Sequence, residues 1–183
     1  RLLGAILAKG YIYRGLKPVN WCFDWQSALA EAEVEYEDRT DIAIDVGFEV
    51  DPRDRAKLAR AFALDLLPDG PVRAVIWTTT PWTIPANQAL VVHPDLAYSL
   101  VETDRGSFIL ASELVDDCLK RFGAARKEPT SRFEHRAQGR ALEHLRFRHP
   151  FYDRDSPVQP GECGTPEQGP GLVQTRPAEG GGD

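Results

Sequence analysis

The sequence stretch that decides the fold is Val72-Arg73-Ala74-Val75-Ile76-Trp77-Thr78-Thr79-Thr80-Pro81-Trp82-Thr83-Ile84-Pro85-Ala86-Asn87. Its first part is a nearly continuous apolar run between the turn residues 69–71 and Pro81, which is the pattern of a buried strand. The polar residues that follow indicate a strand that presents hydroxyl groups at its end. Because a threonine offers a donor, an acceptor and a methyl group, the row suits a pocket for a small aliphatic molecule with a polar head. The same threonines also fit a solvated strand edge, since threonine has a high strand propensity.

Strand and helix patterns alternate on both sides of this stretch, which indicates a mixed α/β fold. Apolar residues at every second position predict a half-buried strand over 42–50, and residues 52–67 have the pattern of an amphipathic helix. Further strands are predicted at 90–92, 98–101 and 108–110. A helix is predicted over 113–122, with Ser112 as its N-cap and Gly123 as its C-cap. A short helix is predicted near the start, over 2–7, and the composition of 27–35 favours a helix on propensity alone.

The overall composition is that of an ordinary globular protein, with 42% hydrophobic and 27% charged residues and a net charge of −6. No apolar run approaches the ~18 residues that a membrane-spanning helix needs. Three widely spaced cysteines, Cys22, Cys118 and Cys163, suit a reducing compartment, so a cytoplasmic location is expected. Cys118 falls in a predicted helix, where it fits a buried apolar filler. The chain has no methionine, even at position 1, which suggests an internal piece of a longer protein.

The positive charges are concentrated in one window. Residues 120–149 contain nine Lys or Arg residues and three Glu residues, a net charge of +6 in a chain of net charge −6. Such a segment could contact the phosphates of an RNA backbone. It could equally be a solvated helix and loop. His149, which ends this window, precedes a proline and is predicted to be a turn residue.

Four collinear motifs resemble one known family. Residues 77–87 resemble the threonine-rich signature of the editing domain of isoleucyl-tRNA synthetases, and the related valyl and leucyl enzymes carry arginine at the position of Thr80. Further matches lie at 15–36, 87–98 and 149–151, so that the resemblance extends from about Leu2 to Asp183. The sequence is identified as a member of the bacterial-type isoleucyl-tRNA synthetases, which are class I aminoacyl-tRNA synthetases, and as an internal fragment that spans the editing (CP1) insertion.

This resemblance implies two parts. Residues 1–49 would be the end of a Rossmann-type nucleotide-binding core, with a connecting ribbon, in helical and extended structure. Residues 50–183 would form the editing (CP1) domain, a β-barrel-like mixed α/β fold with peripheral helices. Its C-terminal part is dense in glycine and proline, so we expect it to be rich in loops and truncated. The motifs of the aminoacylation core are absent from these residues.

The resemblance also implies the roles of individual residues. Thr78, Thr79, Thr80 and Thr83 would form the wall and polar floor of a pocket that hydrolyses valine from misacylated tRNA(Ile). Trp77 and Asn87 would support this pocket and contact the terminal adenosine. A second pocket is needed because one methylene gives only ~1–3 kcal/mol of discrimination, a figure for which the isoleucyl enzyme is itself the usual example. Threonine hydroxyls and backbone N–H groups can position the water and stabilise the oxyanion.

A second family motif, Gly-x-Gly-x-Val-His-x-Ala-Pro, matches residues 169–177 with two changes. Gln174 stands where the family has histidine, and Arg176 stands where it has alanine. A glutamine can donate and accept hydrogen bonds, but it cannot take up a proton as imidazole does. Asp183 lies at the spacing of the family's aspartate and would bind the α-ammonium group of the substrate.

A zinc-binding pattern of some family members, Trp-Cys-x-x-Cys, is incomplete here. Trp25 replaces the second cysteine, and Cys22 alone does not make a tetrahedral site, so no metal site is expected.

The function expected from the resemblance is that of an editing module in an isoleucine–tRNA ligase. Its partners would be the acceptor end of tRNA(Ile) and valine or isoleucine, and it would act as a monomer without a membrane. No cofactor is expected for this chain, whereas ATP and Mg²⁺ are expected for the full-length enzyme. Two alternatives stay open: a catalytically inactive module that binds the 3′ end of tRNA, and a decayed fragment without activity.

Overall fold

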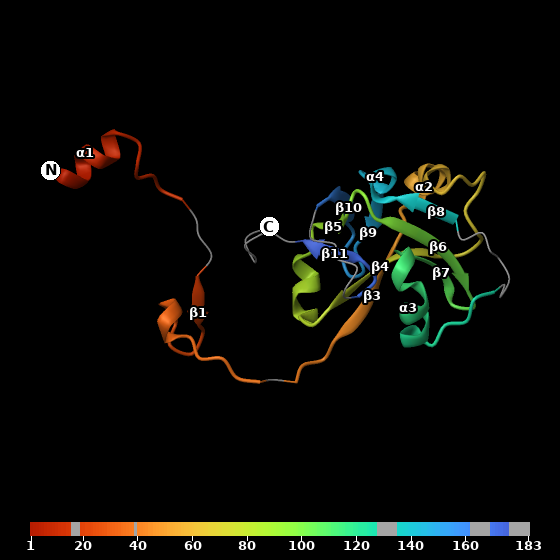
Figure 1. Cartoon of the computed structure of the whole chain (residues 1–183), viewed down its shortest axis with the longest axis horizontal. Coiled ribbons are helices and arrows are strands. Elements are labelled where there is room, and N and C mark those ends of the chain that lie inside the picture. The colour runs from red at the N-terminus through yellow and green to blue at the C-terminus, as the bar shows by residue number, and fades with distance from the viewer. Residues whose placement is uncertain (16–18, 39, 128–134, 162–168, 176–183) are drawn as a thin grey trace. The chain divides into compact units, whose positions relative to one another are not determined.

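The computed structural model describes residues 1–15, 19–38, 40–127, 135–161 and 169–175. Two compact units are present, one within residues 1–39 and one within residues 40–177 (Figure 1). The first unit contains helix α1 (Leu2–Ala8), strands β1 (Asn20–Cys22) and β2 (Ser27–Leu29), and the 3-10 turn η1 (Glu31–Glu33). The predicted helix near the start is confirmed. The stretch 27–35, which favours a helix by composition, is instead a strand of a β-hairpin followed by a single turn.

The second unit is built on two β-sheets. The five-stranded sheet has the order β3-β4-β7-β6-β8, formed by β3 (Ile44–Glu49), β4 (Val72–Thr78), β7 (Gly106–Ala111), β6 (Ala97–Thr103) and β8 (His135–Gln138). The four-stranded sheet has the order β11-β5-β10-β9, formed by β11 (Leu172–Thr175), β5 (Ala89–Val92), β10 (Asp155–Pro160) and β9 (Arg146–Arg148). Neighbouring strands are antiparallel except in the pairs β4–β7 and β5–β10. The buried strand predicted at the start of the 72–87 stretch is therefore confirmed as β4.

Side-chain alternation along β4 separates the core into two layers. Ala74 and Ile76 are fully buried in a cluster that also contains Leu90 of β5 and Leu172 of β11, so this face of the five-stranded sheet packs on the four-stranded sheet. Val75 belongs to a second cluster, beneath helix α3 (Val115–Phe122). Residues 77 and 78 consequently point to opposite faces: the tryptophan to the α3 side, the threonine to the side of the four-stranded sheet.

The helices are shorter than the sequence predicts. The helix expected over 52–67 is the 3-10 turn η2 (Pro52–Asp54) followed by α2 (Arg55–Ala61), and it stops where Ala63 adopts a φ of 54°. A small helix, α4 (Gly139–Leu142), contacts α2 (Figure 1).

Of the two caps predicted for α3, the C-cap is confirmed and the N-cap is wrong. Gly123 closes the helix in the left-handed conformation, as expected. Ser112 is not the N-cap: it lies in the 3-10 turn η4 (Ser112–Leu114), and its hydroxyl is hydrogen-bonded to that of Ser99 at 2.8 Å. The hydroxyl of Ser112 is thus bonded to a side chain of β6, and no side-chain cap bond is formed at the start of the helix.

The mixed α/β class is confirmed, but the described strands do not close into a barrel. Among the described strands the two sheets remain separate, and an antiparallel bridge between Val50 and Phe147 links them. The boundary expected between residues 49 and 50 falls inside the second compact unit, because β3 pairs with β4 along its whole length. Within the described ranges, no helix has both the length and the apolar character needed to cross a bilayer.

Candidate functional site

The threonine-rich stretch forms a turn at the end of β4, and we call residues 78–87 the threonine turn. Most of it is the 3-10 element η3 (Pro81–Ala86), which begins at a proline whose fixed φ suits a first helical position. Two backbone bonds span three residues each: the Thr83 N–H donates to Thr80 O at 3.0 Å, and the Asn87 N–H donates to Ile84 O at 2.9 Å. The chain then enters β5, so the turn connects the two sheets.

Three threonine hydroxyls meet inside this turn. The Oγ1 atoms of Thr78 and Thr80 lie 3.2 Å apart, and those of Thr80 and Thr83 lie 3.4 Å apart. The Thr80 N–H donates to Thr78 Oγ1 at 3.0 Å, and the Thr83 hydroxyl donates to Thr80 O at 2.6 Å. Thr78 and Thr83 are buried, at 7% and 8% exposure. The solvated-edge interpretation therefore fails for these two residues.

Gln174 of β11 joins the cluster from the other motif. Its Nε2 group donates to Thr83 Oγ1 at 2.8 Å. The direction of this bond is fixed, because the hydroxyl proton of Thr83 is already given to Thr80 O and the oxygen can only accept from the amide. The amide oxygen, Oε1, is buried and has no hydrogen-bond partner among the described residues. A buried acceptor without a donor is unfavourable, so this atom is suited to bind a donor on a ligand.

The other predicted site residues have different positions. Thr79 is exposed and stands apart from the hydroxyl cluster. Trp77 is half-buried, and its Cβ lies so close to Gly169 that a side chain there would meet it at 2.8 Å. Asn87 is fully buried, with its amide donating to Ala89 O at 2.8 Å and its Oδ1 accepting from the Ser156 hydroxyl at 2.7 Å. Asp183, like Arg176, lies outside the described residues.

Sequence reasoning missed the role of His149, for which the following proline predicted only a turn. The side chain is 5% exposed, and its Nε2 lies 2.8 Å from Ile84 O in the threonine turn. Burial lowers the pKa of His149, and the nearby charge of Arg154 acts in the same direction. The imidazole is therefore neutral at neutral pH. The resemblance at 149–151 was the only signal that could have pointed to it.

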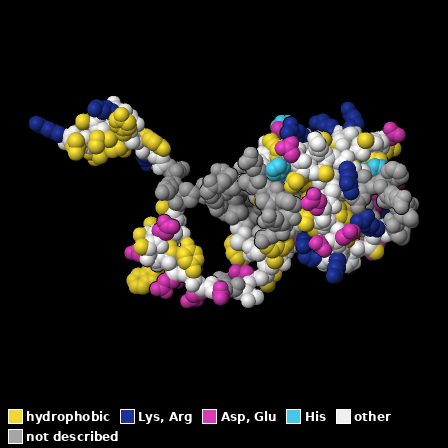
Figure 2. All heavy atoms as spheres, in the orientation of Figure 1, with side chains coloured by type: hydrophobic (Ala, Val, Ile, Leu, Met, Phe, Trp, Pro, Cys, Tyr) yellow, Lys and Arg dark blue, Asp and Glu magenta, His cyan; other side chains and the backbone are white. Residues whose placement is uncertain are grey.

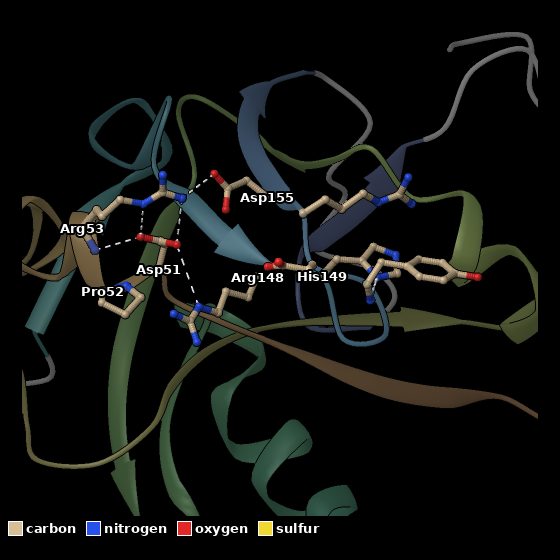
Figure 3. A pocket seen from close by; sticks show the side chains of 9 residues that line it. Asp51, Pro52, Arg53, Arg148, His149 and Asp155 are labelled. Carbon is tan, nitrogen blue, oxygen red and sulfur yellow. Dashed lines mark hydrogen bonds and ion pairs between the residues drawn. The ribbon is translucent and has the colours of Figure 1, made fainter.

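A cavity of about 400 Å³ opens beside this histidine (Figure 3). Asp51 and Asp155 both pair with Arg53 at 2.7 Å, and Arg148 lies farther from Asp51, at 3.9 Å. The hydrogen bonds from Arg53 lower the pKa of Asp51 to about 2, although burial opposes this effect. The acids and arginines of this cavity largely neutralise one another.

Four of the nine basic residues in the window 120–149 form close ion pairs with acids of other segments. The ion pairs are Arg121–Asp45, Arg126–Asp116, Arg140–Asp95 and Arg146–Asp54. Figure 2 shows basic and acidic side chains interspersed over the visible face of the second unit. This arrangement favours the solvated interpretation of the window over RNA contact.

Two of the three cysteines lie in the described residues. Cys118 is fully buried in the cluster beneath α3, as expected of an apolar filler, and Cys22 is half-buried; both are free thiols. Within the part of the chain that the structure describes, no three His, Cys, Asp or Glu side chains come together as a metal ion would require.

Residues 1–141 match the family described as "tRNA synthetases class I (I, L, M and V)". The chain belongs to this family. Among relatives of known assignment, it is 55% identical over 180 residues to the isoleucine–tRNA ligase of Aromatoleum aromaticum, covering 98% of this chain and 19% of that protein. It is 54% identical over 180 residues to the isoleucine–tRNA ligase of Dechloromonas aromatica, with the same coverage. The chain thus spans about a fifth of the length of these class I synthetases.

Two solved structures of similar fold come from leucyl enzymes. The crystal structure of GlLeuRS-CP1 superposes with a TM-score of 0.59 at 16% identity, over 73% of this chain and 58% of that one. The editing domain of the P. knowlesi cytosolic leucyl-tRNA synthetase gives a TM-score of 0.57 at 12% identity, over the same shares. At these identities the likeness establishes the fold alone.

Proposed function

We propose that this class I synthetase chain is an editing module, and that it hydrolyses the ester of valyl-tRNA(Ile). The observation that carries the proposal is the bond between Gln174 and Thr83, which joins two motifs 91 residues apart into one site. The site combines threonine hydroxyls and methyl groups with a buried acceptor that has no donor of its own. Such a lining suits a small aliphatic amino acid with a polar head.

The described part of the cluster offers hydrogen bonds but no group that ionises near neutral pH. When the Thr80 hydroxyl donates to Thr78, the proton of Thr78 is free to stabilise an oxyanion on the ester. Gln174 Oε1 can accept a bond from the attacking water or from the ammonium group of the amino acid. In this proposal the site accelerates hydrolysis by positioning the water and stabilising charge, and Asp183 would hold the ammonium group.

The remaining predicted residues have supporting roles in this proposal. The side chain of Asn87 is buried, and its nitrogen and oxygen each have a partner inside the protein. Asn87 would therefore set the shape of the turn, and other groups would contact the adenosine. Trp77 would contact the tRNA end from the α3 side of the sheet. Thr79, which is exposed at the mouth of the turn, would contact substrate through its hydroxyl or its backbone.

A second candidate is a module that binds the 3′ end of tRNA without hydrolysing it. The observation in its favour is Gln174 itself, since glutamine cannot exchange protons as the family's histidine can.

Deacylation separates these candidates. The 183-residue chain is incubated with valyl-tRNA(Ile), and with isoleucyl-tRNA(Ile) as the control substrate, while released amino acid and bound tRNA are measured. Faster release of valine than of isoleucine supports editing. Binding of valyl-tRNA(Ile) with release at the uncatalysed rate refutes editing and supports the binding module.

A further inference from the structure

Residues 149–156 hold the threonine turn from outside the hydroxyl cluster. His149 contacts Ile84 O through Nε2 at 2.8 Å. Arg154 donates to Pro85 O and to Asn87 O, each at 2.6 Å. Together with the bond from the Ser156 hydroxyl to the Asn87 side chain, four hydrogen bonds fall on three residues at the end of the turn: 84, 85 and 87. We call residues 149–156 the clamp segment.

The threonine turn accepts external donors at its C-terminal end, where the last carbonyls of a helical element have no partners within it. Pro81 and Pro85 have no N–H group, so the turn forms fewer internal hydrogen bonds than a helix of the same length. At the end of the turn, the carbonyls of Pro85 and Asn87 accept from Arg154, and Ile84 O, which already accepts from the Asn87 N–H, is reinforced by His149. His149 and Arg154 supply those donors.

The protonation state of His149 is set by its other nitrogen. Nδ1 accepts from the backbone N–H groups of Phe151 and Tyr152, at 3.1 and 3.2 Å. The single proton of the neutral ring is thus on Nε2, where it is donated to Ile84 O. The ring is held by Phe48, at a centroid distance of 6.2 Å, and by the stacked ring of Tyr152, at 5.1 Å.

Hydrogen bonds and an ion pair fix the clamp segment to the rest of the second unit. His149 N–H donates to Arg154 O at 3.0 Å, which closes the segment into a loop. Asp155 begins β10 and pairs with Arg53 at 2.7 Å, and Arg53 pairs with Asp51 (Figure 3). The donors that reach the turn therefore come from a rigid support.

We propose that His149 and Arg154 are positioning residues for the proposed editing site. They fix the carbonyl side of the threonine turn, and this places the Thr83 hydroxyl where Gln174 can bind it. The inference rests on the proposed function only for its catalytic consequence, since the hold on the turn is a separate claim about structure. Ile84 is the neighbour of Thr83, so a shift of its carbonyl moves the hydroxyl cluster directly.

The test uses two substitutions that each retain one half of the histidine. In His149→Gln the side-chain amide can reach Ile84 O in place of Nε2. In His149→Asn the side-chain oxygen can accept from residues 151 and 152 in place of Nδ1, but the amide is too short to reach the turn. We expect His149→Asn to lower kcat for valyl-tRNA(Ile) deacylation about tenfold with little change in KM, and His149→Gln to retain most of the activity.

Arg154 has a matched control in the same cavity. Arg148 is also exposed, but its nearest acid is 3.9 Å away and it makes no contact with the turn among the hydrogen bonds described. Arg154→Gln should reduce kcat as His149→Asn does, whereas Arg148→Gln should leave it unchanged.

Hydrogen exchange at the Thr83 and Asn87 amides provides a readout that does not depend on catalysis. With His149→Asn and Arg154→Gln these two amides should exchange about tenfold faster, while amides of β4 keep their rates. If the unsubstituted chain releases no valine, the proposed function fails. Hydrogen exchange at the Thr83 and Asn87 amides then decides by itself whether His149 and Arg154 hold the threonine turn. If exchange and kcat respond equally to His149→Asn and His149→Gln, or if Arg154→Gln matches the Arg148 control, the positioning role is refuted.

Discussion

Replacing Thr83 by valine tests the hydrogen bond that completes the site. Valine has nearly the shape of threonine, so no cavity forms, but the hydroxyl is lost. The buried amide of Gln174 then has no acceptor, which costs about 1–3 kcal/mol, and the bond from Thr83 to Thr80 O is worth about 0.5–1.5 kcal/mol. Thr80 O is not orphaned, because the Thr83 N–H still donates to it. We expect the free energy of unfolding to fall by about 1.5–4.5 kcal/mol in total.

Urea denaturation measures this loss, and the exposed Thr79 supplies the control. Thr79→Val should change the free energy of unfolding by less than about 0.5 kcal/mol. In a Gln174→Leu background the amide is absent. The loss of unfolding free energy caused by Thr83→Val should then be smaller, by about 1–3 kcal/mol, than in the chain that retains Gln174. If Thr83→Val lowers the free energy of unfolding equally with and without Gln174, the two side chains do not bind each other in solution. The claim that their hydrogen bond joins the two motifs into one site is then refuted. The same variant should release valine more slowly than the unsubstituted chain.

Three further outcomes are expected. The pKa of His149 in the folded protein lies below its ordinary value of about 6.5. The contribution of the neutral ring to the free energy of unfolding is therefore fully present above that pH and is lost as the pH falls through the lowered pKa. An NMR titration that gives a pKa at or above 6.5 would contradict this expectation. In urea denaturation, Asp54→Asn should lower the free energy of unfolding by about 2 kcal/mol. This is less than for a fully buried ion pair, because the partner Arg146 is 33% exposed. Asp69 is exposed, so Asp69→Asn should leave the free energy of unfolding almost unchanged. Gln174→His should retain the bond to Thr83 through Nε2 and speed deacylation about tenfold or more at pH 7; an unchanged rate in a folded variant would show that glutamine is not the limiting departure.

Local patterns in the sequence predicted the strands and one cap well. The apolar run of β4 and the alternation of β3 are properties of a few neighbouring residues, and so is the left-handed conformation of Gly123. The errors have two different causes. Ser112 bonds Ser99 across the sheet instead of capping its helix, and Ala63 ends α2 by its backbone conformation.

The site was predictable only through its resemblance to a family. Propensity favoured a structural role for the threonines, and nothing local links Thr83 to Gln174. The clamp segment was missed because its donors bind backbone carbonyls, and any residue type can supply a carbonyl. His149 before a proline therefore looked like an ordinary turn residue, although its ring is buried and makes three hydrogen bonds.

The position of β11 has a consequence for the order of events on the ribosome. The strand pairs with β5, and Gln174 emerges 91 residues after its threonine partner. At synthesis rates of about 5–20 residues per second, this separation corresponds to roughly 5–18 s. During that interval the nascent chain has the hydroxyl end of β4 but lacks the strand that covers one edge of β5. A chaperone that protects unpaired strand edges would find its target in β5 during these seconds.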